Sequence, residues 1–399
     1  MSAFAPISPD SIPIRLAIVT ETWPPEINGV ANTISRLVMG LRERGDYQLQ
    51  LIRPRQLADE KAIHTSGFQE YLVKGLTLPF YREVRVGLPH YCALKRLWQQ
   101  QRPDLVQIVT EGPLGYSAIK AAKQLSIPLI SDFHTNFDEY SRYYHLKSCF
   151  QLAKRYLRHL HNQTCLTLVP TRELQQQLKA GGYTRLSILD RGIDTALFNP
   201  QRRNPTLRER LGIQPTALLV VLVTRMAQEK NLELAFKAFS AIQVQCPHAR
   251  FLLVGDGPER KRLQAQHPDC YFVGMQTGIA LAEHYACSDL FLYPSTSETF
   301  GNVILEAMAS GLPVVSFNYA ASREYIRSGE NGMAVPLYDE QAFIQASITL
   351  AINPTLRENM GKAAYQTALG LGWERVVQRL HTTIQSVLRE TSDETVTPA

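Results

Sequence analysis

Residues 295–311 read STSETFGNVILEAMASG and come directly after a short apolar run at 290–293. An apolar run, a turn containing glycine and an amphipathic stretch are typical of one strand-to-helix step in a parallel α/β sheet. The turn sets two carboxylates, Glu298 and Glu306, around the start of the expected helix. Ionised carboxylates bind sugar and ribose diols through charge-assisted hydrogen bonds, and free amides at a helix start attract phosphate. The stretch therefore predicts an α/β fold with a site for a polyhydroxylated ligand that carries a diphosphate.

Short β-branched runs alternate with longer helical patterns along the rest of the chain, in two successive series. Strands are expected at 14–19, 49–52, 105–109, 128–131 and 166–169 in the first series, and at 218–223, 251–254, 271–273, 290–293 and 314–317 in the second. Each series predicts an open sheet that binds ligands beyond the carboxyl ends of its strands. We therefore expect two Rossmann-like domains that face a central cleft, at 14–195 and 200–370. They are flanked by a flexible leader at 1–13, a crossover helix at 371–390 that returns to the first domain, and a frayed tail at 391–399.

Composition and charge fit this picture. The 399 residues are 45% hydrophobic and 20% charged, which is the composition of a globular protein of two or more domains. The formal net charge of +6 lies in the first half, where 24 Lys and Arg face 17 Asp and Glu, against 18 and 19 in the second half. A one-sided basic charge suits an anionic membrane surface or an acidic substrate, and a solvated charged face is the ordinary alternative.

The chain gives no signal for metal sites, disulfides or membrane spans. Its six cysteines are far apart and form no C-x-x-C pair, which indicates reduced thiols and neither a zinc site nor a disulfide framework. No apolar run approaches the roughly 18 to 20 residues that cross a bilayer. We expect a cytoplasmic protein that contacts the inner face of the membrane only peripherally, if at all.

Several residues at expected strand ends could serve a phosphorylated ligand. Gly29 opens an amphipathic helix after the first strand, where the backbone could approach a phosphate, although the pattern is not G-x-G-x-x-G and so disfavours a nicotinamide site. Arg225 and Lys230 follow the strand at 218–223, and the two cations could offset a leaving diphosphate without a metal. His134 follows the strand at 128–131. Surface charge for the cations and a structural role for the histidine are the alternatives.

A basic amphipathic helix is expected between residues 140 and 161. Its apolar face holds Cys149, Phe150, Ala153, Tyr156, Leu157 and Leu160, and another face holds Lys147, Lys154, Arg158 and His161. Such a helix can lie on anionic lipid. It can equally pack on its own sheet with its charges in water.

Three segments carry a resemblance to a known family: PPEINGVANT at 24–33, RMAQEKN at 225–231 and ETFGNVILE at 298–306. Over nearly its whole length the chain resembles retaining glycosyltransferases of the GT-B fold, family four. Within that family, TEGPLG at 110–115 and FHTNFDEY at 133–140 look most like GDP-mannose-dependent α-mannosyltransferases and sulfoquinovosyl-diacylglycerol synthases. Two positions depart from the family pattern, because Thr224 and the pair Ala320 and Ala321 stand where the family usually has glycines.

The resemblance implies a role for each matching residue. Gly29 would approach the donor phosphate, Arg225 and Lys230 would stabilise the diphosphate, Glu298 would hold the transferred sugar, and Glu306 would take the ribose hydroxyls. The backbone of Phe300, Gly301, Asn302 and Val303 would face the diphosphate and sugar, and His134 would sit beside the anomeric carbon. On the acceptor side the resemblance implies Asn28, Glu111, Thr135, Asn136 and Tyr140.

The expected function is a retaining, metal-independent hexosyltransferase without a cofactor. It would move a hexose from a nucleotide-diphosphate sugar, GDP-mannose or a UDP-sugar, to a lipid or glycan hydroxyl by front-face substitution, with the departing phosphate accepting the acceptor's proton. An epimerase or a phosphorylase on the same scaffold is one alternative, and a non-catalytic protein that binds nucleotide sugars or anionic surfaces is another. No nucleic-acid module is indicated.

Overall fold

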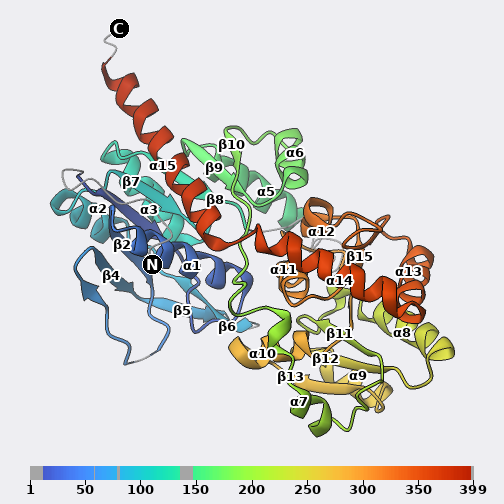
Figure 1. Cartoon of the computed structure of the whole chain (residues 1–399). Coiled ribbons are helices and arrows are strands. Elements are labelled where there is room, and N and C mark those ends of the chain that lie inside the picture. The colour runs from blue at the N-terminus through green and yellow to red at the C-terminus, as the bar shows by residue number, and fades with distance from the viewer. Residues whose placement is uncertain (1–11, 58, 79–80, 135–146, 397–399) are drawn as a thin grey trace. The chain divides into compact units, whose positions relative to one another are not determined.

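The computed structural model describes residues 12–57, 59–78, 81–134 and 147–396. The chain forms two compact units. The first comprises the described residues up to Arg191 together with those from Trp373 onward, and the second runs from Gly192 to Gly372. Each unit has its own sheet and its own core (Figure 1).

The first unit is built on a sheet with the strand order β10-β9-β8-β7-β1-β2-β4-β3. Its pairs are parallel except for β3 with β4, and β5 and β6 form a separate antiparallel pair. The strands are β1 (Ile14–Val19), β2 (Tyr47–Pro54), β3 (His64–Thr65), β4 (Phe68–Val73), β5 (Gly75–Leu78), β6 (Tyr81–Gly87), β7 (Leu105–Ile108), β8 (Leu129–Asp132), β9 (Leu166–Val169) and β10 (Leu186–Ile188). The helices are α1 (Gly29–Arg44), α2 (Tyr91–Gln100), α3 (Pro113–Gln124), α5 (Lys147–His161), α6 (Arg172–Ala180) and α15 (Trp373–Val396).

Helix α15 completes the core of the first unit. Its apolar stripe of Val376, Val377, Leu380, Ile384 and Val387 is buried against β1, β2 and α1. The helix runs beside α1 in Figure 1, and the two approach so closely that a methyl group on Gly40 would overlap the Val377 side chain. Because burial of one aliphatic side chain contributes roughly 1.5 to 3 kcal/mol, this stripe is a large part of the unit's stability.

The second unit has a wholly parallel sheet with the order β13-β12-β11-β14-β15-β16. The strands are β11 (Leu219–Val223), β12 (Arg250–Val254), β13 (Tyr271–Gly274), β14 (Leu290–Tyr293), β15 (Val314–Phe317) and β16 (Gly332–Val335). The helices are α7 (Pro205–Arg210), α8 (Leu232–Gln245), α9 (Arg260–Gln266), α10 (Gly278–Ala286), α11 (Asn302–Ala309), α12 (Ala320–Tyr325), α13 (Glu340–Ile352) and α14 (Pro354–Leu369), with short 3-10 turns η1 (Pro200–Arg202) and η2 (Gln228–Lys230).

Burial on both faces explains why the strands of the second unit read as continuous apolar runs. Alternate residues of β11 and β12 enter two separate cores, one on each face of the sheet. Val221 and Leu252 belong to one core, whereas Val220 and Phe251 belong to the other. Parallel strands covered by helices on both faces characteristically lose the alternation of polar and apolar residues.

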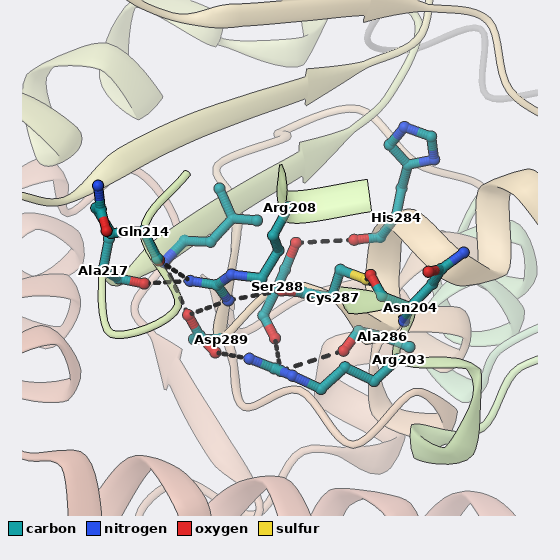
Figure 2. Close-up of polar contacts among 11 residues, drawn as sticks. Arg203, Asn204, Arg208, Gln214, Ala217, His284, Ala286, Cys287, Ser288 and Asp289 are labelled. Carbon is teal, nitrogen blue, oxygen red and sulfur yellow. Dashed lines mark hydrogen bonds and ion pairs between the residues drawn. The ribbon is translucent and has the colours of Figure 1, made fainter. Parts of the chain in front are cut away.

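A partly buried polar cluster fastens the start of the second unit to its sheet (Figure 2). The Asp289 carboxylate accepts hydrogen bonds from Arg203 Nη2 at 3.1 Å and Arg208 Nη1 at 3.2 Å, and from the backbone N–H of Leu219 at 2.8 Å. Arg208 is buried and also donates to the carbonyl oxygens of Cys287 and Ala217. We call Arg203, Arg208 and Asp289 the arginine latch. It ties the segment before β11 to the segment before β14.

The predicted fold class is confirmed: both units are parallel α/β sheets, and the C-terminal helix packs on the first unit. All ten expected strands are present, with ends shifted by at most one residue except in β2, which is two residues longer at each end. Sequence reasoning missed β3 to β6, β10 and β16. Helix α15 also continues to Val396, six residues beyond the expected end at Glu390, and the leader at 1–11 lies outside the described residues.

Three further findings concern the chain's surface and chemistry. No helix among the described residues is both long and apolar enough to cross a membrane. The cysteines whose side chains the structure describes are all free thiols. The prediction that His161 belongs to the basic face of α5 is wrong. His161 is 1% exposed and points into the unit, where the Ser131 hydroxyl forms a hydrogen bond with its Nδ1 at 2.9 Å.

Candidate active site

The carboxyl ends of β11 and β14 define the candidate donor site of the second unit. These neighbouring strands are the point where the strand order reverses, because β12 and β13 extend to one side and β15 and β16 to the other. Ligands of open α/β sheets bind at such a switch point. The loop after β11 holds Arg225 and Lys230, and the loop after β14 holds Glu298. Residues that are about 70 positions apart in the chain are thereby brought together.

Glu298 lies at the centre of this site. Its Oε1 accepts hydrogen bonds from Lys230 Nζ at 2.5 Å, from Ser295 Oγ at 2.9 Å and from the Tyr293 hydroxyl. The Tyr319 hydroxyl contacts both the backbone N–H and the carbonyl of Glu298. A small recess lined by Glu298, Gly301 and Tyr319, among others, opens beside the carboxylate. Charge-assisted donors therefore fix both the side chain and the backbone of this residue.

Sequence reasoning missed the tyrosines and the serine around Glu298. Tyr293 closes an apolar strand and is 5% exposed, so the sequence pattern indicates core packing and carries no sign of its hydroxyl's partner. Tyr319 lies 21 residues beyond Glu298 in the chain. Only the three-dimensional fold brings the Tyr293 hydroxyl to the Glu298 carboxylate and the Tyr319 hydroxyl to the Glu298 backbone.

The loop that carries Arg225 is shaped by the turn after β12. A methyl group on Gly255, whose φ is +130°, would overlap the Thr224 carbonyl, and the Met226 N–H donates to the Asp256 carbonyl at 2.8 Å. Glycine is required here because the two loops approach backbone to backbone. The Arg225 side chain is 45% exposed, and its Nη1 lies 3.9 Å from the Glu229 carboxylate. The guanidinium is therefore accessible at the strand end, as predicted.

Helix α11 begins at the site without a side-chain cap. Gly301 is the N-cap residue at φ +94°, a left-handed conformation that favours glycine, and it supplies no side-chain cap hydrogen bond. Amides at an uncapped helix start attract anions. Asn302 and Val303 supply the first turn, whereas the Phe300 ring is buried in the core and its carbonyl accepts from the Ala321 N–H at 2.8 Å.

Ala320 stands where the family usually has glycine, and its backbone conformation shows why glycine is usual there. It adopts φ +51° at the start of α12, which is the left-handed region where glycine is the usual residue. Such a conformation costs an L residue roughly 1 to 2 kcal/mol. The chain accepts this strain beside the recess next to Glu298, which Ala320 lines.

Glu306 lies on α11, about one turn beyond the first helical residue, Asn302. Its Oε2 accepts a hydrogen bond at 2.9 Å from the hydroxyl of Tyr285, a fully buried residue of α10. Burial raises the pKa of Glu306 to about 7, and the Tyr285 hydrogen bond lowers it by a smaller amount. The carboxyl group thus titrates near neutral pH.

In the first unit, the switch point lies between β1 and β7. Gly29 is exposed as the first residue of α1, and Asn28 is its N-cap, with Oδ1 accepting from the Ala31 N–H at 2.8 Å. The Asn28 Nδ2 also donates to Thr22 Oγ1 at 2.8 Å. Asn28 therefore has a structural task, which is to shape the loop in front of Gly29.

A buried carboxylate that sequence reasoning missed lies at the same switch point. Glu21 follows β1, and its Oε1 accepts the Leu114 N–H at 2.8 Å at the start of α3. A methyl group on Gly112 would overlap the Glu21 carboxylate, which accounts for the glycine of the TEGPLG segment. Burial raises the pKa of Glu21 to about 7 against the lowering effect of the backbone N–H groups. The signal in the sequence was the position of Glu21 directly after a predicted strand.

His134 follows β8 and contacts two charged residues of the first unit. Its Nδ1 lies 3.0 Å from Arg191 Nη2, and its Nε2 lies 3.7 Å from Asp132 Oδ2. Both oxygens of the Asp132 carboxylate accept a hydrogen bond from Gln107 Nε2, at 3.0 Å for Oδ1 and 2.8 Å for Oδ2. The imidazole is held at a strand end, where the sequence placed it.

Glu111 faces a buried histidine. Its Oε1 lies 3.4 Å from His161 Nε2, and its carbonyl accepts a hydrogen bond from the Tyr156 hydroxyl at 2.7 Å. Both partners lie on α5, so Glu111 fastens that helix to the end of β7. Three other residues expected on the acceptor side, Thr135, Asn136 and Tyr140, lie outside the described residues. Across the described part of the chain, no group of three or more His, Cys, Asp or Glu side chains is arranged to hold a metal ion.

Two family models match this chain, one in each half. Residues 27–197 match the model described as Glycosyltransferase Family 4, and residues 217–353 match the one described as Glycosyl transferases group 1. Similar proteins include a GDP-mannose-dependent alpha-mannosyltransferase of Corynebacterium glutamicum, which is 29% identical over 92% of this chain and 88% of its own length. The sulfoquinovosyl transferase SQD2 of Arabidopsis thaliana is also 29% identical, over 94% of this chain and 74% of its own length.

Solved structures share the fold. A sucrose-phosphate synthase from Thermosynechococcus elongatus superposes with a TM-score of 0.78 at 17% identity, covering 94% of this chain and all of the other. At that identity the likeness concerns the fold alone. The two parallel α/β units described above therefore have an architecture that is already known from solved structures.

Proposed function

We propose that this glycosyltransferase, whose first half matches the Glycosyltransferase Family 4 model and whose second half matches the Glycosyl transferases group 1 model, transfers a hexose from a nucleotide-diphosphate sugar to a hydroxyl acceptor with retention of configuration. GDP-mannose or a UDP-sugar is the donor, and a lipid or glycan hydroxyl is the acceptor. The second unit holds the donor, and the first supplies the acceptor side. The proposal rests on the convergence of Lys230, Glu298 and the uncapped start of α11 at the switch point of the second unit.

Each donor-site group has a chemical task in this proposal. Arg225, Lys230 and the amides of Gly301, Asn302 and Val303 stabilise the negative charge that develops on the leaving diphosphate. Glu298 accepts hydrogen bonds from the sugar hydroxyls, and Glu306 accepts them from the ribose. Preorganised donors of this kind are commonly the largest electrostatic contribution to catalysis.

Retention follows from front-face substitution. The bond between the anomeric carbon and the donor phosphate oxygen breaks, the acceptor oxygen bonds to the same face, and the acceptor's proton passes to the departing phosphate. Double displacement requires a carboxylate on the far face of the sugar. Glu298 does not fit that task, because its Oε1 is already held by Lys230, Ser295 and Tyr293.

A donor panel tests the site. Glu298→Gln, Lys230→Met and Arg225→Met should each lower kcat about a hundredfold or more with the GDP or UDP sugar that the wild type accepts, because each removes an interaction with the transferred sugar or the leaving group. Lys237→Met is the matched control, since Lys237 lies seven residues beyond Lys230 and pairs only with the exposed Glu340 at 3.0 Å. Wild-type turnover in all three site variants would refute the donor site.

Product analysis separates the proposal from its alternatives. With a labelled donor and an acceptor, a retaining transferase yields a product with the donor's anomeric configuration. An epimerase would change the sugar without an acceptor, and a phosphorylase would require inorganic phosphate. A protein that binds the donor but forms no product with lipid or glycan acceptors would favour the non-catalytic alternative.

We further propose that α3 and α5 form a surface for anionic membrane, where a lipid acceptor would be met. Leu152 is 70% exposed on α5, Tyr156 and Tyr116 are half-exposed with ring centroids 6.3 Å apart, and Lys120 lies 5.8 Å from the Tyr116 ring. Apolar, aromatic and basic side chains on one surface suit the interface of an anionic bilayer. Leu152→Glu should weaken cosedimentation with anionic vesicles several-fold. Ile352→Glu in the second unit, at a side chain that is 50% exposed, should not, and equal loss in both variants would refute this surface.

A further inference from the structure

The side chain of Arg191 lies against the candidate catalytic histidine. Arg191 belongs to the Arg-Gly-Ile-Asp segment at 191–194, is 6% exposed, and directs Nη2 to His134 Nδ1 at 3.0 Å. The imidazole is also largely buried. The contact therefore joins two buried groups of the first unit that are 57 residues apart.

The chemistry of the pair fixes where the imidazole proton lies. A guanidinium is always protonated and has only N–H donors, so it cannot accept a hydrogen bond. His134 Nδ1 must then contribute its lone pair, and in a neutral imidazole the single ring proton sits on Nε2. Arg191 thus selects one of the two tautomers.

The backbone around Arg191 is fastened to α15. The neighbouring Asp190 accepts hydrogen bonds from Arg375 Nη2 at 2.6 Å and from Arg379 Nη1 at 2.9 Å. Arg191 Nη1 also donates to the Leu189 carbonyl at 3.4 Å. A guanidinium held in this way is preorganised, so little conformational entropy is lost when it orients its partner.

We infer that Arg191 is a positioning residue that holds His134 as the Nε2–H tautomer, with the ring proton on the side of Asp132 Oδ2, 3.7 Å away, so that the imidazole offers a hydrogen-bond donor there and does not remove a proton from the acceptor hydroxyl. The inference rests on the proposed function, in which His134 is a candidate catalytic residue of the first unit. His134 then acts as a hydrogen-bond donor and not as a general base. The proton of the acceptor hydroxyl must then leave by another route, and the departing phosphate of the donor provides one.

Nitrogen NMR of the histidine side chains tests the tautomer directly in the full-length protein. His134→Ala identifies the signal among those of the ten histidines. In the neutral wild-type protein we expect a protonated Nε2 and an unprotonated Nδ1. A protonated Nδ1 in the wild type would overturn the inference whatever the variants do.

Two substitutions separate the hydrogen bond from the charge. Arg191→Met removes every donor and should mix the tautomers and lower kcat roughly tenfold to hundredfold, with the donor KM changed less than about threefold, because a wrong tautomer loses the transition-state contact. Arg191→Gln keeps an N–H donor without a charge and should restore the Nε2–H tautomer and most of the turnover. Failure of Arg191→Gln to restore the tautomer would count against the hydrogen bond.

Arg375→Met is the matched control, because it removes one arginine contact to Asp190 and leaves the contact between Arg191 and His134 in place. It should retain the wild-type tautomer and turnover within about threefold. If Arg191→Met keeps wild-type tautomer and kcat while His134→Ala is inactive, the role of Arg191 is wrong and the proposed function stands. If His134→Ala keeps wild-type turnover, the role of His134 in the proposed function fails first.

Discussion

At the scale of single residues, the two carboxyl groups of the candidate donor site, Glu298 and Glu306, have different surroundings. Glu298 is contacted by an ammonium group and two hydroxyls. Glu306 has the Tyr285 hydroxyl as its hydrogen-bond donor, and burial raises its pKa to about 7. The proposed contact between Glu306 and the ribose therefore depends on pH near neutrality.

We predict that donor binding strengthens as the pH rises through about 7. The folded protein holds a proton on Glu306 below that pH, and a protonated carboxyl accepts ribose hydroxyls less well than a carboxylate. Below pH 7 the Kd of the nucleotide sugar should rise by up to about tenfold per unit. Calorimetric titration from pH 5.5 to 8.5 measures this, with the intact nucleotide sugar as ligand because its diphosphate diester does not titrate there.

Glu306→Gln is the control for the titration. Its amide has no ionisation in this range, so its donor affinity should be weak and independent of pH. A pH dependence that persists unchanged in Glu306→Gln would assign the titration to another group. Glu21, whose pKa is also about 7, lies in the first unit and would be the next residue to substitute.

The sequence revealed those site residues whose chemistry shows in local spacing. Arg225, Lys230 and Glu298 follow strands that apolar runs predict, so the contact between Lys230 and Glu298 could be inferred. Tyr293 and Tyr319 could not be found in this way, because a tyrosine in a buried strand or loop is usually core. His161 was wrongly assigned to a solvent face because periodicity says which residues share a face, not which face is buried.

At the scale of elements, continuous apolar runs made the central strands predictable. The strands that were missed lie at sheet margins or are partly exposed: β10 is partly buried throughout, and β3 is exposed. β4 and β16 each mix buried with exposed or half-buried positions. Half-buried strands lack the uniform apolar signal, so their hydrogen-bonded neighbours decide their conformation.

The arginine latch gives an element-scale prediction for stability. Asp289→Ala should lower the free energy of unfolding of the second unit by about 3 to 5 kcal/mol, because it leaves the buried Arg208 guanidinium without its carboxylate and the Leu219 N–H without its acceptor. Thermal or urea denaturation of the full-length protein, followed in both units, measures this.

Glu340→Ala is the comparison for the latch. It removes an ion pair with Lys237 in which both side chains are more than half exposed, and exposed pairs contribute little. Its unfolding midpoint should match that of the wild type. Equal midpoints for Asp289→Ala and Glu340→Ala would show that the latch does not stabilise the unit.

At the scale of the whole molecule, the two units differ in how the chain builds them. Among the described residues the second is one continuous segment, and its two ends are neighbours, because the Ile193 N–H donates to the Leu371 carbonyl at 2.9 Å and Ile193 forms a bridge with Gly372. The first unit is discontinuous and takes α15 from the far end of the chain. The chain therefore enters and leaves the second unit at one place, and that unit closes without the first unit's residues in either of its cores.

This connectivity predicts the fate of fragments. Residues 192–372 should fold cooperatively alone and bind the nucleotide sugar, since all the second-unit donor-site residues are included.

Residues 1–191 should not fold, because the five buried side chains of α15 contribute about 10 kcal/mol, comparable to the whole stability of a domain. Joining 1–191 to 373–399 through a short Gly-Ser linker should restore folding, since the bridge between Ile193 and Gly372 brings the two cut points together. Circular dichroism and thermal unfolding distinguish the three fragments. A cooperative transition in 1–191 alone, at the same temperature as in the linked form, would mean that the α15 stripe is dispensable to the first core.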